Sequence, residues 1–189
     1  MSLVLSQNAP ADALLDRDPL ALLLALLLDQ QVPMERAFAA PYELAQRLGH
    51  GLDVHELADY EPEALADLFA KQPALHRYPK AMAGRVQHIC QALVERYDGD
   101  VAGLWRDVPD AHELLERLVA LPGYAIQKAQ IFVALLGKQR GVQPEGWREA
   151  SGCYGEEGVY RSVADVTDAV SLAKVREYKQ QMKAAKTKK

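Results

Sequence analysis

The sequence predicts an all-α protein, and three observations support this fold class. Leucine and alanine are abundant whereas phenylalanine is scarce, a composition that favours helices. Apolar residues recur at helical spacing, and no segment shows the alternation of period two that marks a half-buried strand. Prolines and glycines fall between the apolar segments, where helices begin and end. We therefore expect a succession of helices joined by turns.

Local start and stop signals place the individual helices. Residues up to about Arg17 are expected to form an irregular lead-in. Asp18 suits an N-cap and Pro19 the first helical position, Asp110 caps a later helix, and Gly137 ends another. Helices are expected over residues 18–31, 34–49, 53–71 (as two short pieces), 80–97, 110–121, 125–137, 144–150 and 164–189.

Charge and cysteine content narrow the classes of function and of metal site that the chain can have. The formal net charge is −4, which argues against a large basic footprint but leaves room for a small basic face. The two cysteines, Cys90 and Cys153, form no Cys-x-x-Cys pair, so we expect reduced thiols in a cytoplasmic protein, without structural zinc or an iron–sulfur cluster. The histidines are scattered, so we expect no metal site and no cofactor.

The most apolar segment, Leu20–Leu28, is too short to cross a bilayer. Acidic residues precede it, in place of the basic region with which a signal peptide begins. We therefore expect a buried helix in the middle of the fold and no membrane partner.

The stretch LVALPGYAIQKA, residues 118–129, joins two helical segments by a tight corner. Pro122 cannot extend the preceding helix, and Gly123 can adopt the positive φ of a sharp reversal. The second helix then starts with free backbone N–H groups at Tyr124 to Gln127, where partial positive charge favours an anion such as a DNA phosphate. The alternative is a plain αα-hairpin that binds nothing, with Lys128 as a solvated surface residue.

Three segments, in this order along the chain, resemble the helix-hairpin-helix DNA glycosylase superfamily (HhH-GPD), the group of endonuclease III and the adenine and 3-methyladenine glycosylases. They are LDQQVPMERA at residues 28–37, KAMAGRVQHICQALVERYDGD at 80–100 and LLERLVALPGYAIQKAQIFVALLG at 114–137. The hairpin is the most specific part of a resemblance that covers roughly residues 19–137. It implies two helical lobes with a cleft between them. These are a lobe of residues 30–136, with the helix-hairpin-helix motif at about 110–137, and a second lobe of residues 1–29 plus 137–189.

The resemblance also implies a function in DNA base excision repair. Family members bind duplex DNA that contains a damaged base, extrude the target nucleotide into the cleft and hydrolyse its N-glycosidic bond. By this resemblance we expect a DNA glycosylase that is monomeric, cytoplasmic and nucleoid-associated. The alternatives are a non-catalytic helix-hairpin-helix DNA-binding protein and a helical protein without any DNA role.

The resemblance assigns the DNA-binding residues. Residues 122–125 are expected to contact DNA, with Gly123 and Ala125 as the phosphate-binding turn, and the family usually has a second glycine where Ala125 stands. Gln30 and Gln31 follow the apolar helix, and Gln31 stands where family members insert a polar side chain into the gap left by the flipped base. A glutamine amide suits this position because it both donates and accepts hydrogen bonds. The alternative is that both glutamines simply end an apolar helix.

The match departs from the family pattern at the nucleophile. Bifunctional members carry a Schiff-base lysine early in the helix after the hairpin. Gln127 occupies that place, and Lys128 follows one residue later, rotated by about 100° around the helix. We therefore expect a monofunctional reaction that uses water, with Gln127 and Lys128 in contact with DNA. If the hairpin holds one inserted residue, the alternative is a bifunctional glycosylase/AP lyase that uses Lys128.

A carboxylate is expected to support the attack of water. Counting from Gln127 as the family pattern directs leads to Glu145, where the family has aspartate, and Asp165 is the second candidate. Helix-dipole stabilisation and helix capping are the alternative roles of these two acids. Trp147 and Tyr154 are expected to stack on the extruded base in its pocket, and their alternative role is packing in a loop-rich segment.

Overall fold

The computed structural model describes residues 2–188, and within this range every regular element is a helix. The predicted all-α class is therefore confirmed. The described residues include three 3₁₀ helices, η1 (Val101–Leu104), η2 (Gly152–Gly155) and η3 (Val163–Asp165). The α-helices are α1 (Ala9–Arg17), α2 (Pro19–Leu28), α3 (Met34–Leu48), α4 (Val54–Asp59), α5 (Pro62–Ala70), α6 (Pro79–Tyr97), α7 (Ala111–Val119), α8 (Ile126–Gln139), α9 (Trp147–Ala150) and α10 (Ala169–Thr187).

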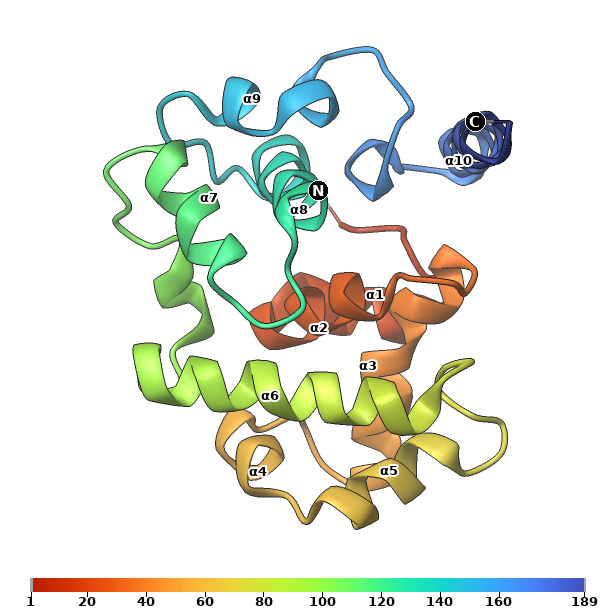
Figure 1. The fold of residues 1–189 in the computed structure, drawn as a ribbon, viewed down its shortest axis with the longest axis vertical. Helices are drawn as coiled ribbons and strands as arrows, with labels where there is room; N and C mark the ends of the chain where they lie inside the picture. Colours follow the sequence, from red (N-terminus) through yellow and green to blue (C-terminus); the bar gives the residue numbers. More distant parts are fainter. Residues whose placement is uncertain (1, 189) are drawn as a thin grey trace.

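The helices form three tiers along the long axis of the molecule (Figure 1). In the lowest tier, α6 packs across α4 and α5. The middle tier holds α1 and α2, and α3 runs from there down to α5; the upper tier holds α7, α8 and α9, with α10 to one side. The turn between α7 and α8 descends to the level of α2, so the hairpin reaches the middle tier. The division into lobes of residues 30–136 and 1–29 plus 137–189 stays a prediction.

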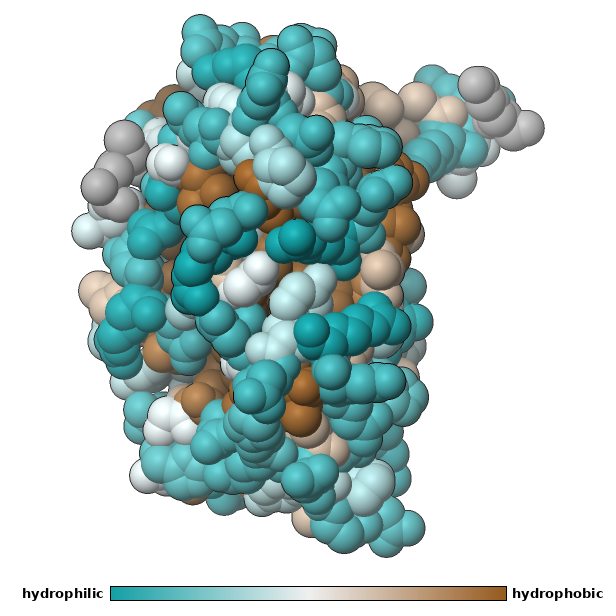
Figure 2. All heavy atoms as spheres, turned by 90° about the vertical axis from the view of Figure 1, so that its left-hand side faces the viewer, coloured by the Kyte–Doolittle hydropathy of each residue, from teal (hydrophilic) through white to brown (hydrophobic). Residues whose placement is uncertain are grey.

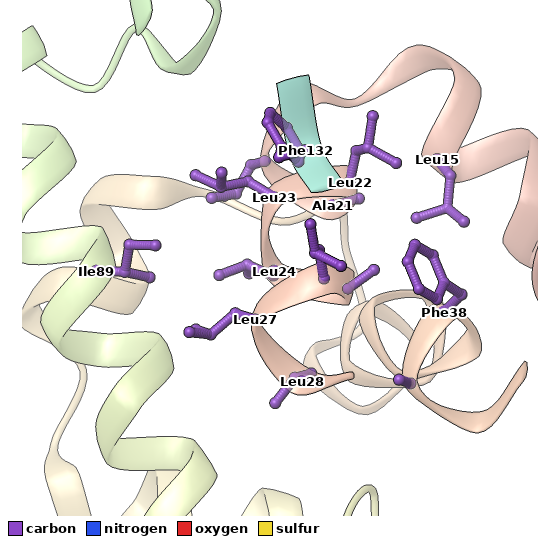
Figure 3. Packing of buried hydrophobic residues seen from close by; sticks show 14 of the residues in the cluster. Leu15, Ala21, Leu22, Leu23, Leu24, Leu27, Leu28, Phe38, Ile89 and Phe132 are labelled. Carbon is purple, nitrogen blue, oxygen red and sulfur yellow. The ribbon is translucent and has the colours of Figure 1, made fainter. Parts of the chain in front are cut away.

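α2 is the centre of the core, as its apolar sequence predicts. Asp18 caps it by accepting a hydrogen bond from the N–H of Leu20, and every residue from Leu20 to Leu28 is buried. Each fully buried leucine contributes about 1.5–3 kcal/mol, so this helix anchors the tiers to one another. Figure 3 shows its neighbours on several sides, which are Leu15 of α1, Phe38 of α3, Ile89 of α6 and Phe132 of α8.

The N-terminal segment differs from the predicted irregular lead-in. Residues Ala9–Arg17 form α1, and Asn8 caps it by accepting a hydrogen bond from the N–H of Ala11. Leu14 and Leu15 are buried against the core. The segment is too short for its periodicity to indicate a helix by itself, and packing against α2 and α3 supplies the missing stabilisation.

Two predicted helix ends are also wrong, for different physical reasons. α8 continues past Gly137 to Gln139, and the glycine leaves space for Trp147 instead of ending the helix: a Cβ at position 137 would lie 2.3 Å from Trp147 Cε3. α2 stops at Leu28, before the predicted residue 31, because Asp29 leaves the helical region and Gln31 has a φ of 57°.

α10 is attached to the body by its first half. Leu172 and Val175 are buried, and Arg176 pairs with Glu35 of α3. The last turns project from the body as a mostly hydrophilic arm (Figure 2). The helix begins at Ala169, later than predicted, because residues 163–165 form η3. Among the helices described here, none combines the length and apolar character that crossing a membrane requires.

Candidate nucleic-acid interface

The corner between α7 and α8 has the backbone geometry that its sequence predicts. Gly123 has a φ of 86°, and both Pro122 and Gly123 are exposed. The N–H of Tyr124 donates to the carbonyl of Leu121 at 3.2 Å and closes the turn. A Cβ at position 123 would also lie 2.6 Å from Leu27 Cδ1, so glycine is required by the backbone angle and by the space available.

Tyr124 fastens this corner to the core. Its side chain is 1 % exposed, and its hydroxyl donates to the carbonyl of Leu23 in α2 at 2.6 Å. Its ring meets Phe132 of α8 edge-on, and burial raises the pKa of the phenol well above its usual value. The family resemblance places Tyr124 among the DNA-binding residues. In the structure, its side chain supports the turn from inside.

The start of α8 is an open hydrogen-bond donor site. Ala125 is the N-cap with a φ of −65°, an angle that alanine adopts without strain, so the family's second glycine is not needed for the backbone. Within residues 2–188, no side chain caps the first amides of this helix. A depression of about 520 Å³ lies at the corner, and Arg85 and His88 of α6 line it together with Gly123 and Ala125. Free amides at a helix N-terminus beside basic side chains favour an anion.

A groove of about 460 Å³ adjoins this depression, and Ala125 lines both. Its walls come from the end of α2, the first turns of α8, the segment after α9 and one face of α10. In the described part of the chain, Asp29 is the only carboxylate among its lining residues. Because the formal net charge of the chain is −4, the groove concentrates positive charge on an otherwise acidic protein. The basic lining residues are Lys128, Arg161, Lys179, Lys183 and Lys186.

Lys128 lies in the groove, but backbone carbonyls surround its ammonium group. Its Nζ donates to the carbonyl of Leu26 at 2.6 Å and lies 3.4 Å from the carbonyls of both Leu27 and Asp29. The ammonium therefore caps the C-terminal end of α2, where helix carbonyls lack intrahelical partners. Burial lowers the pKa of Lys128 to about 8, and the charge of Asp29 partly opposes that shift.

A second residue holds the same turn, and sequence reasoning missed it. His76 is buried, and its Nε2 lies 3.0 Å from the carbonyls of Leu28 and Gln30. Its Nδ1 accepts a hydrogen bond from the N–H of Tyr78, and burial lowers the pKa of the ring. The neutral tautomer with a proton on Nε2 satisfies all three contacts. A lone histidine in a connector carries no sequence signal for this role.

The two glutamines after α2 have different surroundings. Gln30 lines the groove, its Nε2 donates to the carbonyl of Leu27, and its Oε1 accepts from Arg85 at 2.7 Å. Gln31 lies at the tip of the turn, where its side chain is exposed and its backbone is in the left-handed region. The structure thus leaves the side chain of Gln31 free to enter another molecule, whereas Gln30 links the groove to the depression at the hairpin.

The two carboxylates predicted from the sequence lie outside the groove. Glu145 is exposed in a separate depression beside α9, and its carbonyl accepts a hydrogen bond from the N–H of Ala111. The side chain of Asp165 is 5 % exposed, pairs with Lys138 Nζ at 2.6 Å and accepts from the N–H of Arg161. The structure therefore does not bring either acid together with Lys128 or Gln30.

The two predicted base-stacking residues are also separated. Tyr154 lines the groove, and its hydroxyl accepts a hydrogen bond from Gln127 Nε2 at 2.8 Å. Trp147 is buried against Gly137, and the guanidinium of Arg148 lies over its ring. Tyr178 of α10 lines the groove near Tyr154 and was not identified from the sequence.

In the part of the chain that the structure describes, no three His, Cys, Asp or Glu residues gather as a metal site requires. Cys90 is buried in α6 with a pKa raised to about 12, and Cys153 is exposed. Two separated thiols cannot supply the ligands of an iron–sulfur cluster, which takes four cysteines.

A tight helical hairpin with open amides, next to a basic groove, defines a helix-hairpin-helix protein equipped to hold a nucleic-acid backbone. The family model described as HhH-GPD superfamily base excision DNA repair protein matches residues 24–189, which include both features. The chain belongs to this superfamily. Searches of curated proteins and of solved structures found no match.

Proposed function

We propose that this protein is a monofunctional DNA glycosylase that hydrolyses the N-glycosidic bond of a damaged base in duplex DNA. The observation that carries the proposal is the direct adjacency of the open hairpin and the basic groove, which share Ala125. Membership of a base excision repair superfamily supports it. In this arrangement the hairpin amides hold one phosphate while the groove receives the extruded nucleotide.

The surroundings of the groove suit a duplex bound by one copy of the protein. Arg85 and His88 flank the hairpin on one side, and Lys183 and Lys186 extend along α10 on the other. Basic groups at both ends contact phosphates before and after the extruded nucleotide. Gln31, exposed at the tip of its turn, fills the gap in the base stack.

The engaged state of Lys128 supports the monofunctional reaction. A Schiff base requires its amine to leave three carbonyl oxygens and attack the sugar. The observation that favours the bifunctional alternative is the lowered pKa of about 8, which raises the fraction of neutral amine near neutral pH.

A panel of duplexes, each with one damaged base, tests this proposal. We expect release of a free base from at least one duplex, with the abasic strand left intact, and no covalent complex after borohydride reduction. Strand cleavage together with a trapped complex that disappears in Lys128→Met would establish the bifunctional alternative instead. Duplex binding without release of any base would support the non-catalytic DNA-binding alternative.

A further inference from the structure

The proposed hydrolysis requires an anion near the reacting sugar, and the groove offers one. N-glycosidic cleavage passes through a sugar with positive charge, which a carboxylate stabilises. Glu145 and Asp165 lie elsewhere, and among the described residues Asp29 is the only carboxylate that lines the groove. It shares that lining with Lys128 and Tyr154.

Asp29 stands at the C-terminal end of α2. It is the C-cap of α2, a helix without a polar side chain, and its own side chain is 9 % exposed. A negative charge at the C-terminal end of a helix meets the negative end of the helix dipole, which is destabilising. Lys179 Nζ lies 3.4 Å from Asp29 Oδ2 and, with Lys128, offsets this repulsion.

The turn that carries Asp29 is rigidly held from two sides. Lys128 Nζ contacts the carbonyl of Asp29 itself, and His76 Nε2 contacts the carbonyls of the residues before and after it. These contacts join segments far apart in the sequence. A carboxylate on a pinned turn keeps its orientation during the reaction, which is the condition for electrostatic stabilisation of a transition state.

We propose that Asp29 is the catalytic carboxylate of this protein. The assignment rests on the proposed glycosylase function. Water adds through its oxygen to C1′ of the deoxyribose while the C1′–N bond breaks and its electron pair passes to the base. Asp29 accepts one proton from that water and then gives it up to the departing base. The carboxylate is thereby regenerated, and the products are a free base and an abasic sugar.

Asp29→Asn tests this role because it removes the charge and keeps the shape. On a lesion duplex that the wild type cleaves, we expect the single-turnover rate of base release to fall by about 100-fold or more. Duplex affinity should stay equal or increase, because a negative charge is lost next to phosphates. The matched control is Asp67→Asn, the same change at an exposed position of α5, which should leave both quantities unchanged.

Two further variants separate catalysis from structure. Asp29→Glu keeps the charge and should restore part of the lost rate, whereas a purely structural role predicts the loss of rate, affinity and melting temperature together. Base release by Asp29→Asn at the wild-type rate, or a loss found only in Glu145→Gln, would overturn the assignment and leave the proposed function standing. If the wild type releases no base from any duplex, the proposed glycosylase function and the assignment of Asp29 are both overturned.

Discussion

Gly123→Ala tests the physical basis of the hairpin. The residue has a φ of 86°, and forcing an alanine into the left-handed region costs about 1–2 kcal/mol. The new Cβ would also lie 2.6 Å from Leu27 Cδ1. Because Leu27 is completely buried, its side chain cannot move without disturbing the core, and such overpacking costs typically about 1–3 kcal/mol more. We therefore expect a total loss of about 2–5 kcal/mol in the free energy of unfolding.

Gly49→Ala is the matched control for this variant. Gly49 has a φ of 81° at the end of α3, and a Cβ there meets nothing within 4 Å. Gly49→Ala should therefore lower the free energy of unfolding only by the cost of the left-handed backbone, about 1–2 kcal/mol. Chemical denaturation measures both losses, and fluorescence anisotropy with a short duplex measures affinity. We expect Gly123→Ala alone to weaken binding, by about tenfold if the displaced corner loses one phosphate contact worth about 1.4 kcal/mol. Equal stability and equal affinity in the two variants would refute this reasoning.

Three other predictions follow from particular contacts. Lys128 has a pKa of about 8 in the folded protein, against 10.5 for an ordinary lysine, so the unfolded state binds more protons between these values. Denaturation at several pH values should show that the free energy of unfolding of the wild type, relative to that of Lys128→Met, rises by up to about 3 kcal/mol from pH 8 to 10.5. A difference between the two proteins that does not change with pH would contradict a buried ammonium at Lys128. Gly137→Ala should lower the melting temperature because Trp147 occupies the space that the new Cβ needs. Gly84→Ala in α6 is the control and should raise the melting temperature, because the space around Gly84 is open. Equal shifts in the two variants would argue against a packing role for Gly137. The double variant Lys183→Gln/Lys186→Gln should reduce the salt slope of duplex affinity by about 1.8, and an unchanged slope would remove these lysines from the interface.

Structural features that depend on a few neighbouring residues can be predicted from the sequence. Asp18 and Asp110 cap helices because an aspartate side chain reaches N–H groups two or three residues ahead. Gly123 was identified because a Pro-Gly corner between helices restricts the backbone. α1 was missed because its stability comes from burial of Leu14 and Leu15 against other segments.

The groove depends on contacts that no local pattern encodes. Asp29 meets Lys179 of α10 from the opposite end of the chain, and Lys128 reaches the carbonyls of α2. Sequence spacing puts Gln127 at the position of the family's lysine and makes Lys128 the nucleophile only if the hairpin holds one inserted residue; in the structure, Lys128 Nζ caps the end of α2. The glycine predicted to end α8 is a packing residue, because Trp147 returns to it from the following loop.

The most direct test of a hairpin-and-groove interface is the change in backbone amide NMR shifts when a duplex is added. We expect the largest changes at Gly123, Ala125, Ile126 and Gln127, with smaller ones along the groove face of α10 and none on α4 or α5. Changes confined to α4 and α5, with the amides at the start of α8 unaffected, would contradict the claim that this corner binds the DNA backbone.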